Sequence, residues 1–347
     1  MPKVLVLATS RHTHGGISSV VTAHERSSQW REHSCRWIAT HRSGSMLTKL
    51  RYLVSGMLQY LWYLPWCKVV HVHVGHGPSA RRKRLFVRLA SVFGKKVIVQ
   101  IHADTAPTIY GPSKDVYAYL FEKADLVLLL SERWKSALDK FCGRKVKSEI
   151  LYNPCPAVKP SETDPESKYI LSAGVLDKNK GYHDLITAFA SVARQFPDWK
   201  LCFAGSGEID RARTLAAELG IASQVEFKGW VTGVAKDSLF RKASIFCLSS
   251  YAEGFPMAVL EAWAYGLPVV ATPVGGLPDI VTDGKEALLF DPGDCAALAQ
   301  RLERLMGDPA LRVRLGSESL RMAYENFNVE NIGRQLGAIY DSLLLNE

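Results

Sequence analysis

Glu253 and Glu261 bracket the stretch of this sequence that is best suited to chemistry. A Gly-Phe-Pro turn signal follows Glu253, and Pro256 fits the first position of a helix because its missing N–H is harmless there. Residues 257–265 then have the composition of a short helix, and Gly266 suits its C-terminal cap. The pattern predicts Glu253 on a loop beside a helix N-terminus, with Glu261 about two turns farther along the helix.

The start of that helix is predicted to be an anion site. Helix N-termini present backbone N–H groups that no helical carbonyl accepts, and they carry the positive end of the helix dipole. A carboxylate on the preceding loop accepts hydrogen bonds from hydroxyl groups. A ligand that carries both hydroxyls and phosphates fits this combination, and a nucleotide sugar is such a ligand.

Three further positions offer ligand-binding chemistry, each with a simpler alternative. Gly15-Gly16 lets the backbone approach phosphates closely, although no Gly-x-Gly-x-x-Gly pattern is present there and an ordinary loop turn explains it equally well. Lys180 is a point charge suited to a departing diphosphate, or else a solvated loop lysine. His102 ends an apolar run and either binds a sugar hydroxyl or caps and packs that run.

The elements that must position these residues alternate between apolar runs and helical patterns. Strands are predicted at 4–8, 34–40, 69–74, 97–102, 126–130, 169–173, 199–204, 225–228, 245–248 and 268–271. Helices are predicted at 17–26, 48–65, 81–93, from 132, and at 183–195, 209–219, 257–265 and 295–345. Strands separated by helices indicate parallel sheets with helices on both faces, whose ligands lie outside the carboxyl ends of the strands.

The length of 347 residues predicts two domains. A stretch rich in Pro, Ser, Glu and Asp, from Pro154 to Lys168, marks the expected junction. We therefore expect two doubly wound, Rossmann-like α/β domains facing across a cleft, at 1–157 and 165–325. The C-terminal helix, 326–347, is expected to pack back onto the first of them.

Charge and cysteine content narrow the class of protein. Residues 1–165 hold 25 of the 43 lysines and arginines but only 11 of the 34 acidic residues, so the first domain is expected to have an anionic partner. The seven cysteines include no Cys-x-x-Cys pair and are expected to be reduced core thiols of a cytoplasmic protein. The apolar run at the start is too short for a signal peptide, and the uncharged residues 52–67 are too few to span a membrane.

A basic run and a pair of histidines could each form a binding site. The basic run Arg81–Arg84, with Arg88 and interleaved apolar residues, is either a solvated helix face or a peripheral contact with anionic lipid on the inner face of the membrane. Nucleic acid is not expected, because no stacking platform or known module is present. His71 and His73 share one strand face, but no acidic or cysteine partner is nearby, so no metal site is expected.

Taken together, these motifs resemble the retaining glycosyltransferases of family 4, which have the GT-B fold. The resemblance covers nearly the whole length and its specific part is the run from Ser250 to Pro292. The motifs occur in the family's order: Gly15-Gly16, the strand end at His102, Ala124-Asp-Leu-Val-Leu, Lys180-Gly181, Glu253 to Glu261, Tyr265-Gly-Leu-Pro-Val-Val-Ala-Thr272 and Val274-Gly-Gly-Leu-Pro-Asp279.

The resemblance implies a role for each matching position. His102 and Glu253 would be the catalytic residues, Glu253 near the anomeric centre of the donor sugar and His102 supporting the transfer. Glu261 would bind ribose hydroxyls, Trp230 would lie near the base, and Lys180 would steady the diphosphate. The remaining donor-binding positions would be Gly15, Gly16, Gly254, Phe255, Pro256, Met257 and Ala258. Such enzymes use no divalent metal and no cofactor beyond the nucleotide diphosphate sugar itself.

One departure bears on activity. The family usually has arginine directly after the glycine at position 174, and here Val175 stands there, so the diphosphate clamp loses a guanidinium. Either Lys178 or Arg11 replaces it, or the diphosphate is held more weakly. A smaller change is Asp279, where glutamate is commoner.

The function implied is transfer of a sugar from a nucleotide diphosphate sugar to a hydroxyl of a saccharide or lipid-linked saccharide, for surface polysaccharide. The alternatives are a nucleotide-sugar epimerase or hydrolase on the same fold, and a non-catalytic nucleotide-sugar-binding protein.

Overall fold

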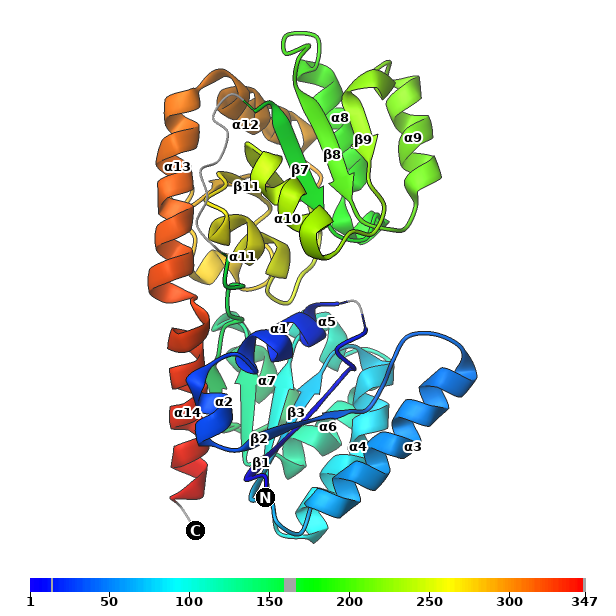
Figure 1. Cartoon of the computed structure of the whole chain (residues 1–347), viewed down its shortest axis with the longest axis vertical. Coiled ribbons are helices and arrows are strands. Elements are labelled where there is room, and N and C mark those ends of the chain that lie inside the picture. Colours follow the sequence, from blue (N-terminus) through cyan, green and yellow to red (C-terminus); the bar gives the residue numbers. More distant parts are fainter. Residues whose placement is uncertain (14, 159–166, 346–347) are drawn as a thin grey trace. The chain divides into compact units, whose positions relative to one another are not determined.

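The computed structural model describes residues 1–13, 15–158 and 167–345. The chain divides into two compact units, coloured along the sequence in Figure 1. Unit 1 comprises Met1–Pro154 and Phe327–Glu347, and unit 2 comprises Cys155–Asn326. Most of the expected junction, residues 159–166, lies outside the described residues.

Unit 1 contains a parallel sheet of six strands in the order β2-β1-β3-β4-β5-β6. The strands are β1 (Val4–Ala8), β2 (Cys35–Ala39), β3 (Val69–Val74), β4 (Lys96–Ile101), β5 (Leu126–Leu129) and β6 (Ser148–Ile150). The helices are α1 (Gly16–His24), α2 (Ser28–Glu32), α3 (Met46–Tyr63), α4 (Gly77–Val92), α5 (Thr105–Ile109), α6 (Lys114–Lys123), α7 (Arg133–Cys142) and α14 (Val329–Leu344). Every strand pair is parallel, as the alternation of apolar runs and helices predicted.

The central strands of this sheet are buried on both faces. β1, β3 and β5 are buried at every position, and their runs of valine and leucine are the composition of a strand covered by helices on both sides. β6 went unpredicted because Ser148–Ile150 is short, half-exposed and carries no apolar run.

The C-terminal helix α14 belongs to unit 1, where it packs against α2 and β3. Asn328 caps its start by accepting a hydrogen bond from Asn331 N–H. Gly333 and Gly337 allow a close approach, because an added Cβ would meet Ser27 at 2.7 Å and His33 at 3.2 Å. Farther along, Asp341 bonds His33 at 3.0 Å, so the helix is held by contacts along its length.

Unit 2 contains a second parallel sheet of six strands, in the order β12-β11-β10-β7-β8-β9. The strands are β7 (Tyr169–Ala173), β8 (Lys200–Ala204), β9 (Val225–Phe227), β10 (Ile245–Leu248), β11 (Val269–Ala271) and β12 (Leu288–Leu289). The helices are η1 (Lys178–Lys180), α8 (Tyr182–Val192), α9 (Ile209–Glu218), η2 (Ala222–Gln224), α10 (Gly233–Lys242), α11 (Met257–Ala264), η3 (Leu277–Asp279), α12 (Cys295–Gly307), α13 (Pro309–Arg321) and η4 (Met322–Asn326). One apolar core joins β7, β8 and β10 to α8, α9, α12 and α13.

The predicted elements differ from the structure at α11, α10 and α3, among others. Pro256 is the N-cap of α11 and not its first helical residue, because its ψ of 103° is extended and helical geometry begins at Met257. The helix α10 was missed, since Gly233–Lys242 has only one fully buried side chain, Phe240, and hence a weak apolar period. The sequence of α3 predicts one buried apolar face formed by Leu50, Leu53, Met57, Leu61 and Leu64, but Leu50 and Leu61 are exposed, because Gly56 and Tyr60 lie on the buried face.

Candidate functional site

Two predicted site residues of unit 2, Lys180 and Glu253, meet at the carboxyl edge of its sheet. Parallel strands end at the same edge, so the loops that follow β7, β10 and β11 are neighbours there. The loop after β7 carries Lys180, and the loop after β10 carries Glu253 and leads into α11. Two predicted residues that are 73 positions apart in sequence are thereby brought together.

Lys180 and Glu253 form an ion pair. The Lys180 Nζ lies 2.5 Å from Glu253 Oε1, and the same oxygen accepts a hydrogen bond from Ser250 Oγ at 2.7 Å. The Glu253 side chain is 13% exposed and that of Lys180 is 32% exposed. The carboxylate is therefore held in a fixed place, and the lysine charge is neutralised until a stronger anion competes for it.

Backbone contacts fix the loops that carry this pair. Ser249 Oγ donates to the carbonyl of Lys180 at 3.0 Å or to that of Gly181 at 2.9 Å, and Tyr251 N–H donates to Asn179 O at 2.7 Å. Gly181 has a φ of +64°, and a Cβ there would lie 2.0 Å from Ser249 O. Only glycine permits this left-handed conformation together with so close an approach.

The loop after β11 packs against the backbone of Glu253 and Gly254. Gly276 N–H donates to Gly254 O at 3.0 Å. The neighbouring Gly275 has a φ of +64°, and a Cβ on it would lie 2.4 Å from Gly254 O and 2.9 Å from Glu253 O. The position of the Glu253 backbone therefore depends on a glycine 22 residues later in the chain.

A second ion pair joins α10 to α11. Lys236 Nζ of α10 contacts Glu261 Oε1 at 2.6 Å, and the Glu261 side chain is 14% exposed. The first acceptor of α11 is Pro256 O, which receives Val259 N–H at 3.0 Å. The N–H groups of Met257 and Ala258 precede that ladder and lie at the positive end of the helix dipole.

Lys236 is a candidate site residue that the sequence analysis missed. A lysine in a weakly periodic stretch carries no local signal, and only the position of α10 beside α11 brings it to Glu261. The other predicted residues of unit 2 differ in exposure. Gly254 and Phe255 are buried, whereas Trp230, in the loop between β9 and α10, is 41% exposed. Val175 is also 41% exposed, so the position expected to hold arginine presents an apolar side chain to solvent.

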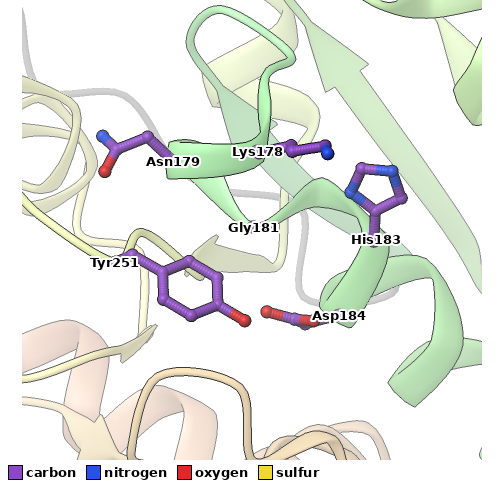
Figure 2. A pocket seen from close by; sticks show the side chains of 6 residues that line it. All are labelled: Lys178, Asn179, Gly181, His183, Asp184 and Tyr251. Carbon is purple, nitrogen blue, oxygen red and sulfur yellow. The ribbon is translucent and has the colours of Figure 1, made fainter.

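A pocket of about 580 Å³ adjoins these loops. Its walls include the sequence neighbours of the Lys180–Glu253 pair, and its lining residues are Lys178, Asn179, Gly181, His183, Asp184 and Tyr251. Figure 2 shows the Tyr251 hydroxyl directed toward the Asp184 carboxylate, and this hydrogen bond raises the pKa of Tyr251. The sequence analysis assigned no role to Tyr251 or Asp184, which lie next to the Glu253–Glu261 and Lys180-Gly181 motifs but outside them.

In unit 1, His102 follows the last residue of β4 and stacks in a row of histidines. Its ring lies 5.0 Å from that of His73, which in turn lies 4.3 Å from that of His71. His102 Nε2 and His73 Nδ1 are 2.8 Å apart, and His71 Nδ1 bonds the Tyr340 hydroxyl of α14 at 2.8 Å. In this hydrogen bond one ring nitrogen must donate and the other must accept, so the tautomer of His73 determines the tautomer of His102.

The row of histidines is uncharged. Burial lowers the pKa of His102 to about 3 and holds the pKa of His71 and His73 well below the ordinary value. Lys83 is buried next to them, where its Nζ donates to the carbonyl of His73, and burial lowers the pKa of Lys83 to about 7. Among the described residues, no group of three or more histidine, cysteine or acidic side chains is placed to hold a metal ion.

The Gly15-Gly16 pair opens α1. Gly15 is the N-cap with a φ of 148°, and Gly16 is the first helical residue. The Ser18 and Ser19 hydroxyls donate to the carbonyl of Gly15 at 2.8 and 3.3 Å. A Cβ built on Gly15 would have no described heavy atom within 4 Å, so the loop leaves open space at this helix start. Arg11, the other residue considered for a diphosphate clamp, forms an ion pair with Glu25 and lies over the ring of Trp37.

Comparison with known proteins decides the family of unit 2. Residues 157–322 match the model of the family described as Glycosyl transferases group 1. These residues form a group 1 glycosyltransferase domain. The match covers the Lys180–Glu253 pair, the Lys236–Glu261 pair and the start of α11. It confirms the predicted resemblance at the level of group 1.

Individual relatives agree with this domain assignment. LpsE of Rhizobium meliloti, a lipopolysaccharide core biosynthesis glycosyltransferase, is 31% identical over 172 residues, which are 49% of this chain and 49% of LpsE. The chain spans about half the length of the curated relatives it matches.

Solved structures extend the likeness to both units. Sucrose-phosphate synthase from Thermosynechococcus elongatus matches with a TM-score of 0.82 at 19% identity, covering 100% of each chain. Anabaena HepE, solved in complex with UDP and glucose, matches with a TM-score of 0.80 at 18% identity, covering 99% of this chain and 100% of HepE. The predicted fold class, two Rossmann-like parallel-sheet domains of the GT-B type, is confirmed.

Within the described residues, no helix combines the length and the hydrophobicity that crossing a bilayer requires.

Proposed function

We propose that this protein is a retaining glycosyltransferase that moves a sugar from a nucleotide diphosphate sugar to a hydroxyl of a saccharide or lipid-linked saccharide. The observation that carries the proposal is the Lys180–Glu253 pair, held at the carboxyl edge of a group 1 glycosyltransferase domain beside the start of α11. A carboxylate, an ammonium and a helix N-terminus side by side supply acceptors for sugar hydroxyls and positive charge for a diphosphate.

Donor binding is proposed to rearrange the charge pair. A diphosphate carries more charge than one carboxylate, so it competes with Glu253 for the Lys180 ammonium and also draws on the N–H groups of Met257 and Ala258. Glu253, still held by Ser250, then accepts hydrogen bonds from the donor sugar near its anomeric carbon. Glu261 is proposed to bind the ribose hydroxyls, with Lys236 orienting its carboxylate, and Trp230 to lie near the base.

The chemical step breaks the bond between the anomeric carbon and the diphosphate oxygen, and the electron pair leaves with the diphosphate. Lys180 and the start of α11 stabilise that charge as it develops, which is where electrostatic catalysis acts. The acceptor oxygen bonds the same carbon on the face that the diphosphate leaves, which retains configuration. The acceptor proton passes to the departing phosphate oxygen, the nearest base on that face. Gly15-Gly16 and His102 of unit 1 are proposed to contribute backbone approach and a sugar contact.

The biological setting is proposed from the relatives and from the cysteines. LpsE acts in lipopolysaccharide core biosynthesis, which supports a role in surface polysaccharide. The cytoplasm is the proposed compartment, because all seven cysteines are free thiols. Val175 favours one alternative, a nucleotide-sugar-binding protein without turnover, because a weaker diphosphate clamp lowers leaving-group stabilisation. An epimerase or hydrolase on this fold would act on the donor without any acceptor.

The test begins with a screen of nucleotide sugars by thermal shift and continues with turnover of the stabilising donor, with and without saccharide acceptors. We expect acceptor-dependent release of nucleoside diphosphate, reduced at least about 100-fold in Glu253→Ala and Lys180→Ala. Lys168→Ala is the matched control, because Lys168 forms an exposed ion pair with Asp198 elsewhere in unit 2.

Each alternative has its own outcome in this test. Wild-type turnover in both site variants would refute the site. Donor binding without turnover would favour the binding protein, and turnover without acceptor would favour the epimerase or hydrolase.

A further inference from the structure

Helix α3 exposes the apolar face that an amphipathic helix normally buries. Five aliphatic side chains follow one another at intervals of three or four residues, and each is between 44% and 76% exposed: Leu47, Leu50, Val54, Leu58 and Leu61. At such intervals the side chains form a continuous stripe along one side of the helix. Contiguous exposed apolar stripes mark interaction surfaces, whereas single exposed leucines are ordinary.

The opposite side of α3 fastens it to unit 1. Gly56 lies against β2 so closely that an added Cβ would be 2.6 Å from Ala39 O. The Tyr60 hydroxyl donates to Phe86 O of α4 at 2.8 Å, and the two rings pack edge to face with centroids 5.1 Å apart. Figure 1 shows α3 at the outer side of unit 1, alongside α4. The stripe is therefore displayed by a firmly anchored helix.

Two tryptophans extend the stripe at the C-terminal end of α3. Trp62 is 65% exposed and Trp66 is 46% exposed, and their ring centroids lie 6.0 Å apart. Exposed indoles are unusual on a surface that faces only water, since the ring is apolar while its N–H is polar. That combination suits the boundary between lipid headgroups and acyl chains.

The charge around the stripe is of one sign. Residues 33–103, which contain α3 and α4, include twelve lysines and arginines and no aspartate or glutamate. Lys49 and Arg51 are exposed on α3 itself. Lys95 is tied to the far end of the helix, where its Nζ contacts Pro65 O at 3.0 Å. The apolar stripe is thus bordered by cations at both ends.

We propose that the stripe of α3, with Trp62, Trp66 and the surrounding cations, is a docking surface for an anionic lipid bilayer. The helix lies in the plane of the headgroups, with leucines and indoles at the acyl boundary and Arg51 and Lys95 against lipid phosphates. A second copy of this chain is the weaker candidate, because two acid-free surfaces of the same sign repel each other. This inference stands independently of the glycosyl transfer proposed above.

The structure also moves the expected contact from α4 to α3. In the basic run of α4, Lys83 is buried on the carbonyl of His73, Arg81 Nε donates to Ser113 Oγ at 3.2 Å, and Arg84 lies over the Tyr119 ring. These residues have partners within unit 1, whereas the apolar residues of α3 face outward. We therefore expect the α4 cations to strengthen the attraction to anionic lipid, and the apolar residues of α3 to insert into the bilayer.

The test is co-sedimentation of the whole chain with two kinds of vesicle, phosphatidylcholine alone and phosphatidylcholine with phosphatidylglycerol. We expect binding to the anionic vesicles that weakens as salt is raised, and much weaker binding to the neutral ones. The triple variant Leu50→Ser, Leu58→Ser, Trp62→Ser should bind anionic vesicles at least roughly 100-fold more weakly, because three inserted apolar side chains are removed without any change of charge.

Matched controls separate insertion from a general loss of apolar surface. Val234→Ser with Val313→Ser removes apolar side chains that are 87% and 65% exposed on α10 and α13 of unit 2, and should leave binding unchanged. Unfolding midpoints of all variants should match wild type, since every substituted side chain is exposed.

Equal vesicle binding by the triple variant and wild type would overturn the proposal. So would absence of vesicle binding together with a concentration-dependent dimer that the triple variant abolishes. Absence of binding with no dimer would also overturn it.

Discussion

Gly275→Ala should damage the candidate site from a position that contacts no ligand in the proposed mechanism. Its φ of +64° makes any side chain unfavourable by about 1–2 kcal/mol. In addition, the new Cβ would lie 2.4 Å from Gly254 O and 2.9 Å from Glu253 O. An ordinary contact needs about 1 Å more, so the Glu253–Gly254 peptide must move by roughly that distance. A displacement of that size at a catalytic group lowers kcat/KM by about 100-fold.

Gly284→Ala is the control for the backbone conformation. Gly284 also has a positive φ, of +80°, but a Cβ there would meet no described atom within 4 Å. Both variants should lose about the same stability from the left-handed conformation, and only Gly275→Ala should lose donor turnover and donor-induced thermal shift. The measurements are kcat/KM for the donor found in the screen and the unfolding midpoint of each variant. Wild-type kcat/KM in Gly275→Ala would show that Glu253 is not fixed by this loop, or that its position is unimportant.

Three further predictions follow from the site and its surroundings. Ser250→Ala removes one hydrogen bond to Glu253 and should raise the donor Kd about three- to tenfold, as a loss of about 1 kcal/mol predicts. The control Ser317→Ala changes an exposed serine of α13 and should leave the donor Kd unchanged. If calorimetry gives Ser250→Ala the same donor Kd as wild type, Ser250 does not belong to the site. Lys83 has a folded pKa of about 7 against 10.5 when unfolded, so the unfolded state binds the extra proton and wild-type stability should rise with pH above 7. The free energy of unfolding of wild type minus that of Lys83→Met should therefore increase by roughly 1 kcal/mol per pH unit between pH 7 and 8.5, and a flat difference in denaturant titrations would contradict a buried neutral amine. His102, with a pKa of about 3, should contribute no limb to the pH profile of kcat/KM between pH 5 and 8; a limb near pH 6.5 that disappears in His102→Gln would show that the ring is charged during turnover.

Local patterns in the sequence were enough to predict most elements and the residues of the donor segment. The valine and leucine runs of β1, β3 and β5 are strands because they suit burial on both faces, and their alternation with helices requires a parallel sheet. Pro256 and Gly266 bracket α11 to within one residue, because proline and glycine restrict or extend backbone conformation whatever lies around them. These signals are carried by neighbours in sequence.

The tertiary structure alone decided which distant residues meet. The order and register of the strands bring Lys180 to Glu253, Lys236 to Glu261 and Gly275 to Gly254, across separations of 73, 25 and 21 residues. The same is true of the face of α3. Its apolar residues predict burial, yet the close approach of Gly56 to β2 and the bond from Tyr60 to α4 turn that face outward. An apolar period shows that a helix has two faces, and only packing decides which of them meets the protein.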